Sequence, residues 1–313
     1  MVTMKLAFVF PGQGSQAVGM MSGYARHPVV RETFAEASDV LGQDLWALVS
    51  SDPDGALDQT VNTQPVMLTA GVAVWRAWQA LGAPTPVVLA GHSLGEYTAL
   101  VAAGALAFRD AVPLVRFRAQ AMQDAVPQGV GAMAAVMGID EAGIAAACAD
   151  AAQGEVVEAV NFNAPGQIVI AGHATAVERA IVAAKARGAK RGVMLPVSAP
   201  FHSSLMKPAA ERLAERLATI AFAPPRIPVL HNCDVLEHAE PDAIRSALAR
   251  QAASPVRWVE TVQAFAARGT THGCECGPGR VLTGLTKRIA PTIAGYALDD
   301  GDGIDAARSA LGA

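Results

Sequence analysis

The sequence predicts an α/β protein in which a core of alternating strands and helices is interrupted by a small separate unit. In the core, short apolar runs such as residues 6–10 and 87–90 each lead into a glycine-rich turn, which is typical of buried parallel strands. Residues 131–199 instead alternate in a β-α-β-β-α-β order. We therefore expect a core made of residues 1–126 and 199–313 and an inserted subdomain made of residues 127–198.

The composition excludes several classes of protein. With 52% hydrophobic and 17% charged residues, the 313-residue chain is globular rather than disordered. A net charge of −4 without a basic stripe argues against nucleic acid as a partner. Four scattered cysteines suit neither a disulfide scaffold nor a zinc site. No apolar run reaches the roughly 20 residues that span a membrane, so we expect a soluble, cytoplasmic protein with no membrane partner.

The N-terminal part combines one predicted strand with long helices. The glycine-rich loop behind strand 6–10 lacks the P-loop pattern that cradles phosphate. Apolar residues at helical spacing predict helices over residues 28–41 and 65–81. Proline favours the first position of a helix, so Pro65 is expected to start the second one. We accordingly interpret Gln64 as a cap of that helix rather than as a site residue.

A strand, a G-x-S-x-G turn and a helix follow one another around Ser93. The apolar run 87–90 precedes the turn, and a helix-like segment follows from residue 97. This order is typical of a nucleophile elbow, where a tight turn exposes the serine hydroxyl and the next helix points its N–H groups at it. Ser93 is therefore a candidate nucleophile.

The predicted helix over residues 108–123 carries two arginines, Arg116 and Arg118. Two residues along a helix correspond to about 200° around its axis, so the two side chains face opposite ways. Only one of them can point inward, and the pattern alone leaves open which one.

Residues 131–199 predict a compact unit of four strands and two helices. The strands are expected at residues 133–138, 156–162, 167–171 and 191–197, and the helices at residues 140–151 and 175–187. This is the ferredoxin-like arrangement, and its position in mid-chain indicates an insertion that forms a cleft against its host. His202 follows at the junction with the core, where it is well placed to face that cleft.

The remainder of the chain resumes the α/β alternation. Strands are expected at residues 227–230, 273–279 and 293–298, and helices at residues 242–253, 258–267 and 281–289. The first of these helices carries Gln251 near its end.

A serine at an elbow needs a base, and its oxyanion needs donors, because the free hydroxyl is a weak nucleophile. His202 is the candidate base. The N–H of Leu94 and an N–H from the loop Gly12-Gln13-Gly14 are the candidate donors. An ordinary hydrolase triad also has an acid shortly before its histidine, and none closely precedes His202. We therefore expect another group, such as a carbonyl oxygen, to orient the imidazole.

Several short segments along the chain share the pattern of one enzyme family. They are Phe10-Pro11-Gly12-Gln13-Gly14-Ser15-Gln16, Gly91-His92-Ser93-Leu94-Gly95-Glu96-Tyr97, Arg118 with Met122-Gln123, Asn161-Phe162-Asn163-Ala164-Pro165-Gly166-Gln167, Phe201-His202, Gln251 with Pro255-Val256-Arg257-Trp258, and Gly277-Pro278-Gly279 before Leu282-Thr283-Gly284-Leu285. In these segments the chain resembles the malonyl-CoA:acyl carrier protein transacylases, collinearly and over essentially its whole length. The resemblance implies a hydrolase-like α/β core with an inserted ferredoxin-like subdomain.

The resemblance also implies a role for each matching residue. Ser93 would accept the acyl group and His202 would serve as its base. Gln13 and Leu94 would supply the N–H groups of the oxyanion hole, and the main-chain carbonyl of Gln251 would accept the ring hydrogen bond of His202.

Three further residues are implied to contact the substrate. Arg118 would bind the free carboxylate of the malonyl group, Phe201 would lie near the malonyl C2 atom, and His92 would line the same site. The reaction would be a ping-pong transfer from malonyl-CoA to the phosphopantetheine thiol of acyl carrier protein, for fatty acid or polyketide synthesis. Both thiol compounds are substrates, so no cofactor or metal is expected, and nothing requires more than a monomer.

Other functions could use the same residues. One is a malonyl transferase subunit for malonate decarboxylation, whose malonyl pocket would be the same. Another is a serine thioesterase or esterase with water as acceptor, against which Arg118 and the missing acid argue. A non-catalytic module that only binds carrier protein is disfavoured, because Ser93, His202 and Arg118 are all present.

Overall fold

The computed structural model describes residues 4–312, which form two sheets surrounded by helices. The larger sheet is parallel and has five strands in the order β7-β2-β1-β8-β9. The strands of this sheet are β1 (Leu6–Phe10), β2 (Val88–Gly91), β7 (Val229–Leu230), β8 (His272–Glu275) and β9 (Ala294–Ala297). All five are close to the predicted ranges, which confirms the α/β core.

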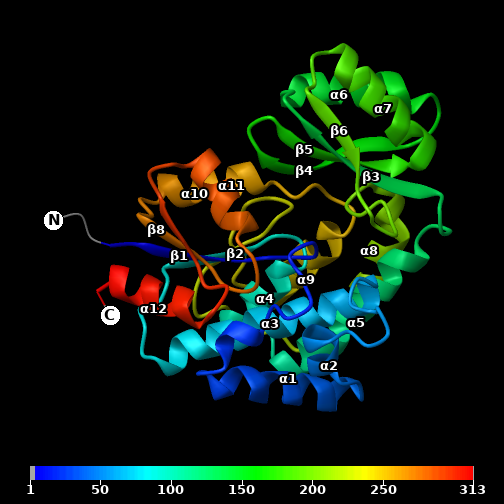
Figure 1. The fold of residues 1–313 in the computed structure, drawn as a ribbon. Coiled ribbons are helices and arrows are strands. Elements are labelled where there is room, and N and C mark those ends of the chain that lie inside the picture. The colour runs from blue at the N-terminus through cyan, green and yellow to red at the C-terminus, as the bar shows by residue number, and fades with distance from the viewer. Residues whose placement is uncertain (1–3, 313) are drawn as a thin grey trace.

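Both faces of the parallel sheet are covered by helices, as the apolar runs require. Successive residues of a strand point to opposite faces. Phe8 and Phe10 accordingly pack with helices α1 and α3, while Ala7 and Val9 pack with α10 and α11. Figure 1 shows these two pairs of helices on opposite sides of the sheet. Strands that are buried on both faces need continuous hydrophobic sequence, which explains why no alternation is visible in them.

The twelve α-helices of the described residues were largely anticipated by their periodicity. They are α1 (Pro28–Leu41), α2 (Leu45–Ser50), α3 (Thr60–Ala80), α4 (Gly95–Ala102), α5 (Phe108–Asp124), α6 (Glu141–Ala152), α7 (Ala174–Ala186), α8 (Lys207–Ala218), α9 (Pro241–Gln251), α10 (Trp258–Ala267), α11 (Val281–Ile289) and α12 (Gly301–Ala310). Helix α12 was not predicted, although the Asp300 side chain caps it by accepting from the Gly303 N–H at 2.6 Å.

One helix boundary was predicted wrongly. Helix α3 begins at Thr60, so Pro65 lies inside it rather than at its start. A proline removes its own N–H from the hydrogen-bond ladder and its ring crowds the carbonyl four residues earlier, yet the helical turn before Pro65 persists here. Gln64 is therefore a buried helical residue and not a cap.

The second sheet is antiparallel, with the strand order β4-β5-β3-β6. Its strands and helices follow the chain order β3 (Gly131–Met137), α6, β4 (Val157–Ala164), β5 (Gln167–His173), α7, β6 (Arg191–Met194). Figure 1 shows this unit, in green, beside the parallel sheet. Its helices pack on the sheet through a separate apolar cluster. Backbone bonds between Val160, Phe162 and Val256 tie it to the core, with N···O distances of 2.8 and 3.0 Å.

None of the helices in residues 4–312 combines the length and the apolar character that a membrane crossing requires.

Candidate active site

Ser93 lies on a sharp turn between β2 and α4, and two glycines make that turn feasible. The Ser93 backbone has a φ of 51°, in the left-handed region. A Cβ atom on Gly91 would lie 1.8 Å from the Gly95 carbonyl carbon, and one on Gly95 would lie 2.0 Å from the Phe10 carbonyl oxygen. No other residue fits at either position, because atoms cannot approach so closely. The predicted elbow is therefore confirmed as a backbone structure.

His202 contacts the serine hydroxyl directly. The distance from Ser93 Oγ to His202 Nε2 is 2.7 Å, and the distance from His202 Nδ1 to the Gln251 carbonyl oxygen is 2.9 Å. Since a carbonyl only accepts, Nδ1 carries the ring hydrogen and Nε2 is free to accept the serine proton. Gln251 is the last residue of α9, where helix carbonyls lack partners within the helix. The expected carbonyl thus takes the place of a triad acid.

The imidazole of His202 is held in its neutral form. Burial lowers its pKa from the ordinary 6.5 to about 3, and the nearby positive charge of Arg118 acts in the same direction. The hydrogen bond to Gln251 opposes these effects without cancelling them. A neutral ring is the form that can accept a proton from a hydroxyl.

Arg118 is the inward-facing arginine of α5. It is only 2% exposed, and its guanidinium donates to Gln64 Oε1 at 2.8 Å, Ser93 Oγ at 3.1 Å and Gln251 Oε1 at 2.9 Å. Its Nε has no hydrogen-bond partner, and no carboxylate among residues 4–312 forms an ion pair with it. Burial lowers the pKa of this guanidinium. The prediction that Gln64 does not belong to the site was wrong, because Gln64 fixes Arg118.

Arg116 faces the other way, as the helical spacing required. Its guanidinium contacts the Gln43 side chain, outside the site. The ambiguity between the two arginines is therefore settled in favour of Arg118 as the residue beside Ser93.

Two backbone N–H groups near Ser93 have no acceptor within residues 4–312. They belong to Leu94, at the start of α4, and to Gln13, in the loop behind β1. Gly12 brings that loop against the elbow, since a Cβ there would lie 2.5 Å from the His92 carbonyl oxygen. The Gln13 side chain is fixed separately, because its Nε2 donates to the Thr60 hydroxyl at 3.0 Å.

A group of buried polar residues behind Ser93 escaped the sequence analysis. Asn232 Oδ1 accepts from the Ser93 N–H at 2.7 Å, and Asn232 Nδ2 donates to the Gly91 carbonyl at 2.7 Å. The Glu96 carboxylate contacts His231 Nδ1 at 2.7 Å and the Asn232 N–H at 2.8 Å. One available signal was that His231 and Asn232 directly follow β7, at the same carboxyl edge of the sheet where Ser93 follows β2.

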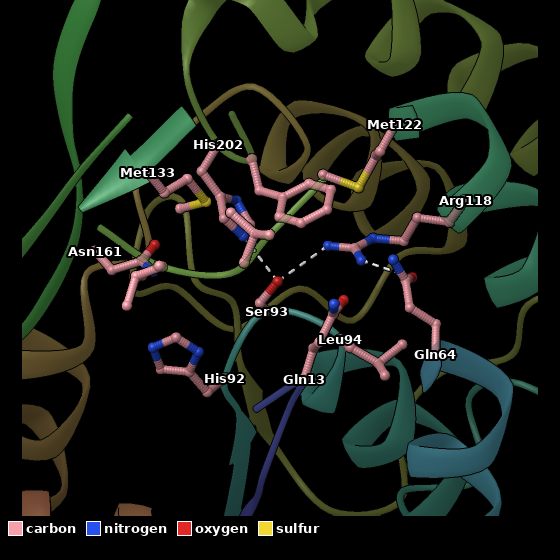
Figure 2. Close-up of a pocket in the computed structure, with 13 residues that line it drawn as sticks. Gln13, Gln64, His92, Ser93, Leu94, Arg118, Met122, Met133, Asn161 and His202 are labelled. Atoms are coloured by element: carbon pink, nitrogen blue, oxygen red, sulfur yellow. Dashed lines mark hydrogen bonds between the residues drawn. The ribbon is translucent and has the colours of Figure 1, made fainter. Parts of the chain in front are cut away.

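A cavity of about 120 Å³ lies beside Ser93, at the junction of the two sheets. Figure 2 shows Ser93, His202 and Arg118 converging on it, with Gln13, Leu94 and Gln64 beside them. Its walls are completed by His92, Met122, Met133, Asn161, Leu195, Val197 and Phe201. The volume suits an acyl group of a few atoms, since one water needs about 10–15 Å³ by the same measure.

His92 and Phe201 both line the cavity, as the resemblance implied. The His92 Nε2 atom is 2.8 Å from Asn163 Oδ1, and its ring lies against that of Trp258. Burial lowers the pKa of His92. Across the part of the chain that the structure describes, no group of three or more His, Cys, Asp or Glu side chains could hold a metal ion.

Comparisons with known proteins agree with this arrangement. A family model for the acyl transferase domain matches residues 7–290. The malonyl CoA-acyl carrier protein transacylase of Escherichia coli K12 is 56% identical over 304 residues, covering 97% of this chain and 98% of the relative. The Bacillus subtilis 168 protein of the same name is 43% identical, covering 98% of this chain and 97% of the relative.

Solved structures give the same result. The acyl-carrier-protein S-malonyltransferase of Burkholderia pseudomallei 1710b is 59% identical, with a TM-score of 0.96, covering 98% of this chain and 100% of that chain. A malonyl-transacylase in complex with its type II PKS acyl-carrier protein is 52% identical, with a TM-score of 0.96, covering 98% of this chain and 99% of that chain. The chain belongs to the acyl transferase domain family and, within it, to the malonyl CoA-acyl carrier protein transacylases.

Proposed function

We propose that the protein transfers the malonyl group from malonyl-CoA to the phosphopantetheine thiol of acyl carrier protein, through a malonyl ester of Ser93. The observation that carries this proposal is Arg118. A buried guanidinium without a carboxylate partner donates to the hydroxyl of Ser93, 3.1 Å away. A buried charge is costly without a counter-ion, so the site favours an acyl group that brings its own carboxylate.

In the first half-reaction, Ser93 Oγ attacks the thioester carbonyl while its proton moves to His202 Nε2. The carbonyl oxygen becomes an oxyanion, which the N–H groups of Leu94 and Gln13 stabilise. The intermediate then collapses: the carbon–sulfur bond breaks and His202 returns the proton to the leaving CoA sulfur. The products are free CoA and malonyl-Ser93.

The second half-reaction repeats these steps in reverse order. The carrier protein's thiol loses its proton to His202 Nε2, attacks the malonyl ester, and Ser93 Oγ leaves with the proton. Here Gln251 holds the imidazolium through its carbonyl rather than through a carboxylate. Both CoA and the phosphopantetheine arm are substrates, so the reaction needs no separate cofactor.

Substrate choice follows from Arg118 and its neighbours. A planar, permanently charged guanidinium binds a carboxylate with two parallel hydrogen bonds, which a lysine does not reproduce. An acetyl group would leave Arg118 unpaired, at a cost of roughly 2–5 kcal/mol. Phe201 restricts the space around the malonyl C2 atom and disfavours a methyl branch there, and His92 also lines the cavity.

The proposal includes the architecture around the site. The core, residues 1–126 and 199–313, is hydrolase-like, and residues 127–198 form a ferredoxin-like insertion. The five parallel strands and the β3-α6-β4-β5-α7-β6 order support these assignments. The carrier protein serves fatty acid or polyketide synthesis, and the complex of a related malonyl-transacylase with a type II PKS carrier protein supports the second use. That the protein works as a cytoplasmic monomer stays a prediction.

Intact-mass measurement after mixing with malonyl-CoA tests the proposal. We expect a malonyl adduct on Ser93 that carrier protein discharges quickly and water slowly, and no adduct on Ser93→Ala. Rapid release of CoA without an acceptor would instead identify a thioesterase. Offering carrier proteins of fatty acid synthesis, polyketide synthesis and malonate decarboxylation in parallel then identifies the pathway.

A further inference from the structure

The Glu96 side chain is completely buried and lies behind the elbow rather than in the cavity. Three donors surround its carboxylate: His231 Nδ1 at 2.7 Å, the Asn232 N–H at 2.8 Å and Gln251 Nε2 at 2.9 Å. An ionised carboxylate only accepts hydrogen bonds, so this set of donors suits a negative charge. The mechanism proposed above does not use this group.

The Gln251 side chain separates two opposite charges. Its Nε2 donates to Glu96 and to the Ser93 carbonyl, and its Oε1 accepts from the Arg118 guanidinium at 2.9 Å. A guanidinium only donates and a carboxylate only accepts, so the amide has one permitted orientation. In that orientation the two charges stabilise each other without touching, and the guanidinium keeps capacity for a further anion.

The same residue also holds the base. The main-chain carbonyl of Gln251 accepts from His202 Nδ1, at 2.9 Å. One residue therefore connects the acyl carboxylate site, through its side chain, with His202, through its backbone. Glu96 is itself held in place, because its carboxylate also contacts His231 Nδ1 and the Asn232 N–H.

We propose that Glu96 is a positioning residue for acyl selectivity: it orients the Gln251 amide so that the amide oxygen faces Arg118 and holds the guanidinium in place for the acyl carboxylate. The Gln251 side chain is thereby a specificity determinant, apart from its carbonyl. This inference rests on the proposed function, since it concerns how that site selects malonyl over acetyl groups. Without the carboxylate, only the Ser93 carbonyl still accepts from the NH2 group, so the amide oxygen is held less firmly toward Arg118.

A double-mutant cycle tests the connection. Gln251→Leu removes the amide but keeps the carbonyl for His202, and Glu96→Gln removes the charge that orients the amide. We expect each variant to lower the ratio of malonyl to acetyl kcat/KM roughly tenfold or more, the scale of one hydrogen bond to a charged group. The double variant should be no less selective than Gln251→Leu alone, because Glu96 acts through the amide.

Glu275→Gln is the matched control. Glu275 is equally buried and accepts from the N–H groups of Leu282 and Thr283, at 3.1 and 2.7 Å, but it lies outside the cavity. We expect its selectivity ratio to equal that of the wild type, whatever happens to its stability. If Glu96→Gln does not fold, Glu96→Asp replaces it, since the shorter side chain keeps the charge but no longer reaches the amide.

The outcomes separate two failures. If the wild type forms no malonyl-Ser93, the proposed function itself is wrong. If the wild type transfers malonyl but Gln251→Leu or the Glu96 variant keeps the wild-type selectivity ratio, only the present inference is overturned. Selectivity losses that add in the double variant would also overturn it, because they would assign Glu96 an independent, structural effect.

Discussion

The two sheets of this protein bury different chemistry. The interior of the antiparallel unit consists of small and aliphatic side chains such as Ala134, Ile144 and Ile170. Every buried polar or charged side chain found within residues 4–312 lies outside residues 127–198, and Glu96, Arg118 and Gln251 are among them. The antiparallel unit nevertheless supplies Met133 and other residues to the cavity wall. Reactivity and pocket shape are thus assigned to separate parts of the fold, and this division can be tested.

The largest effect is expected for Ser93→Ala. Removing the hydroxyl should lower malonyl transfer by about 10⁴-fold or more, because the remaining groups have no nucleophile to act with. Steady-state malonylation of carrier protein measures the loss, and circular dichroism checks that the fold is kept. Transfer at an unchanged rate would show that Ser93 is not the nucleophile.

Arg118→Ala should affect one substrate selectively. We expect malonyl transfer to fall roughly 10²–10³-fold, the scale of a broken buried charge pair, while acetyl transfer persists or improves. The kcat/KM values for malonyl-CoA and acetyl-CoA measure the split. Arg116→Ala, two residues along the same helix but directed at Gln43, is the control and should keep both activities. Equal losses on both substrates would make Arg118 structural.

The rate of acylation should fall on the acid side only well below pH 6.5, and this fall is the acid limb of its pH profile. Burial and Arg118 lower the pKa of His202 to about 3 in the free protein, and only the neutral ring accepts a proton. Acylation therefore persists as the pH falls below 6.5 and is lost as it approaches that lower pKa. Single-turnover acylation with acetyl-CoA measures this limb, which should move to higher pH in Arg118→Ala because one cause of the lowering is gone. An identical limb near pH 6.5 in both proteins would contradict the assignment.

Met133→Ala, in strand β3 of the antiparallel unit, should have the smallest effect. The side chain lines the cavity without contacting Ser93 or His202 by a hydrogen bond. We expect kcat/KM to change only a few-fold, mainly through KM, because the shape of the cavity is altered and the reacting groups are not. Comparing KM with the single-turnover acylation rate checks this. A loss as large as that of Arg118→Ala would show that the antiparallel unit takes part in the chemistry.

The sequence was most informative where one local pattern determines the structure. The strand–turn–helix order around Ser93 needs two glycines within five residues, so the elbow could be predicted. The spacing of Arg116 and Arg118 correctly required opposite directions, but only tertiary packing decides which helix face is buried. Gln64 was misjudged because proline preference was given more weight than the burial of the turn before it.

Residues brought together over long distances in sequence were the hardest to predict. Asn232 contacts Ser93 across 139 positions, and only the pairing of β7 with β2 brings it there. Glu96 stands inside the recognised motif, yet its partners come from two distant places, the loop after β7 and the end of α9. No local pattern encodes such a network, because each member is satisfied only when the sheet is complete.

The left-handed backbone of Ser93 has a consequence for engineering. His202 shares this conformation, with a φ of 68° against 51° for Ser93. Such angles cost a residue with a side chain about 1 kcal/mol or more relative to glycine. A library selected for heat resistance alone will therefore favour glycine at both positions and enrich inert proteins. Any selection for a more thermostable variant of this enzyme therefore has to measure activity as well as melting temperature.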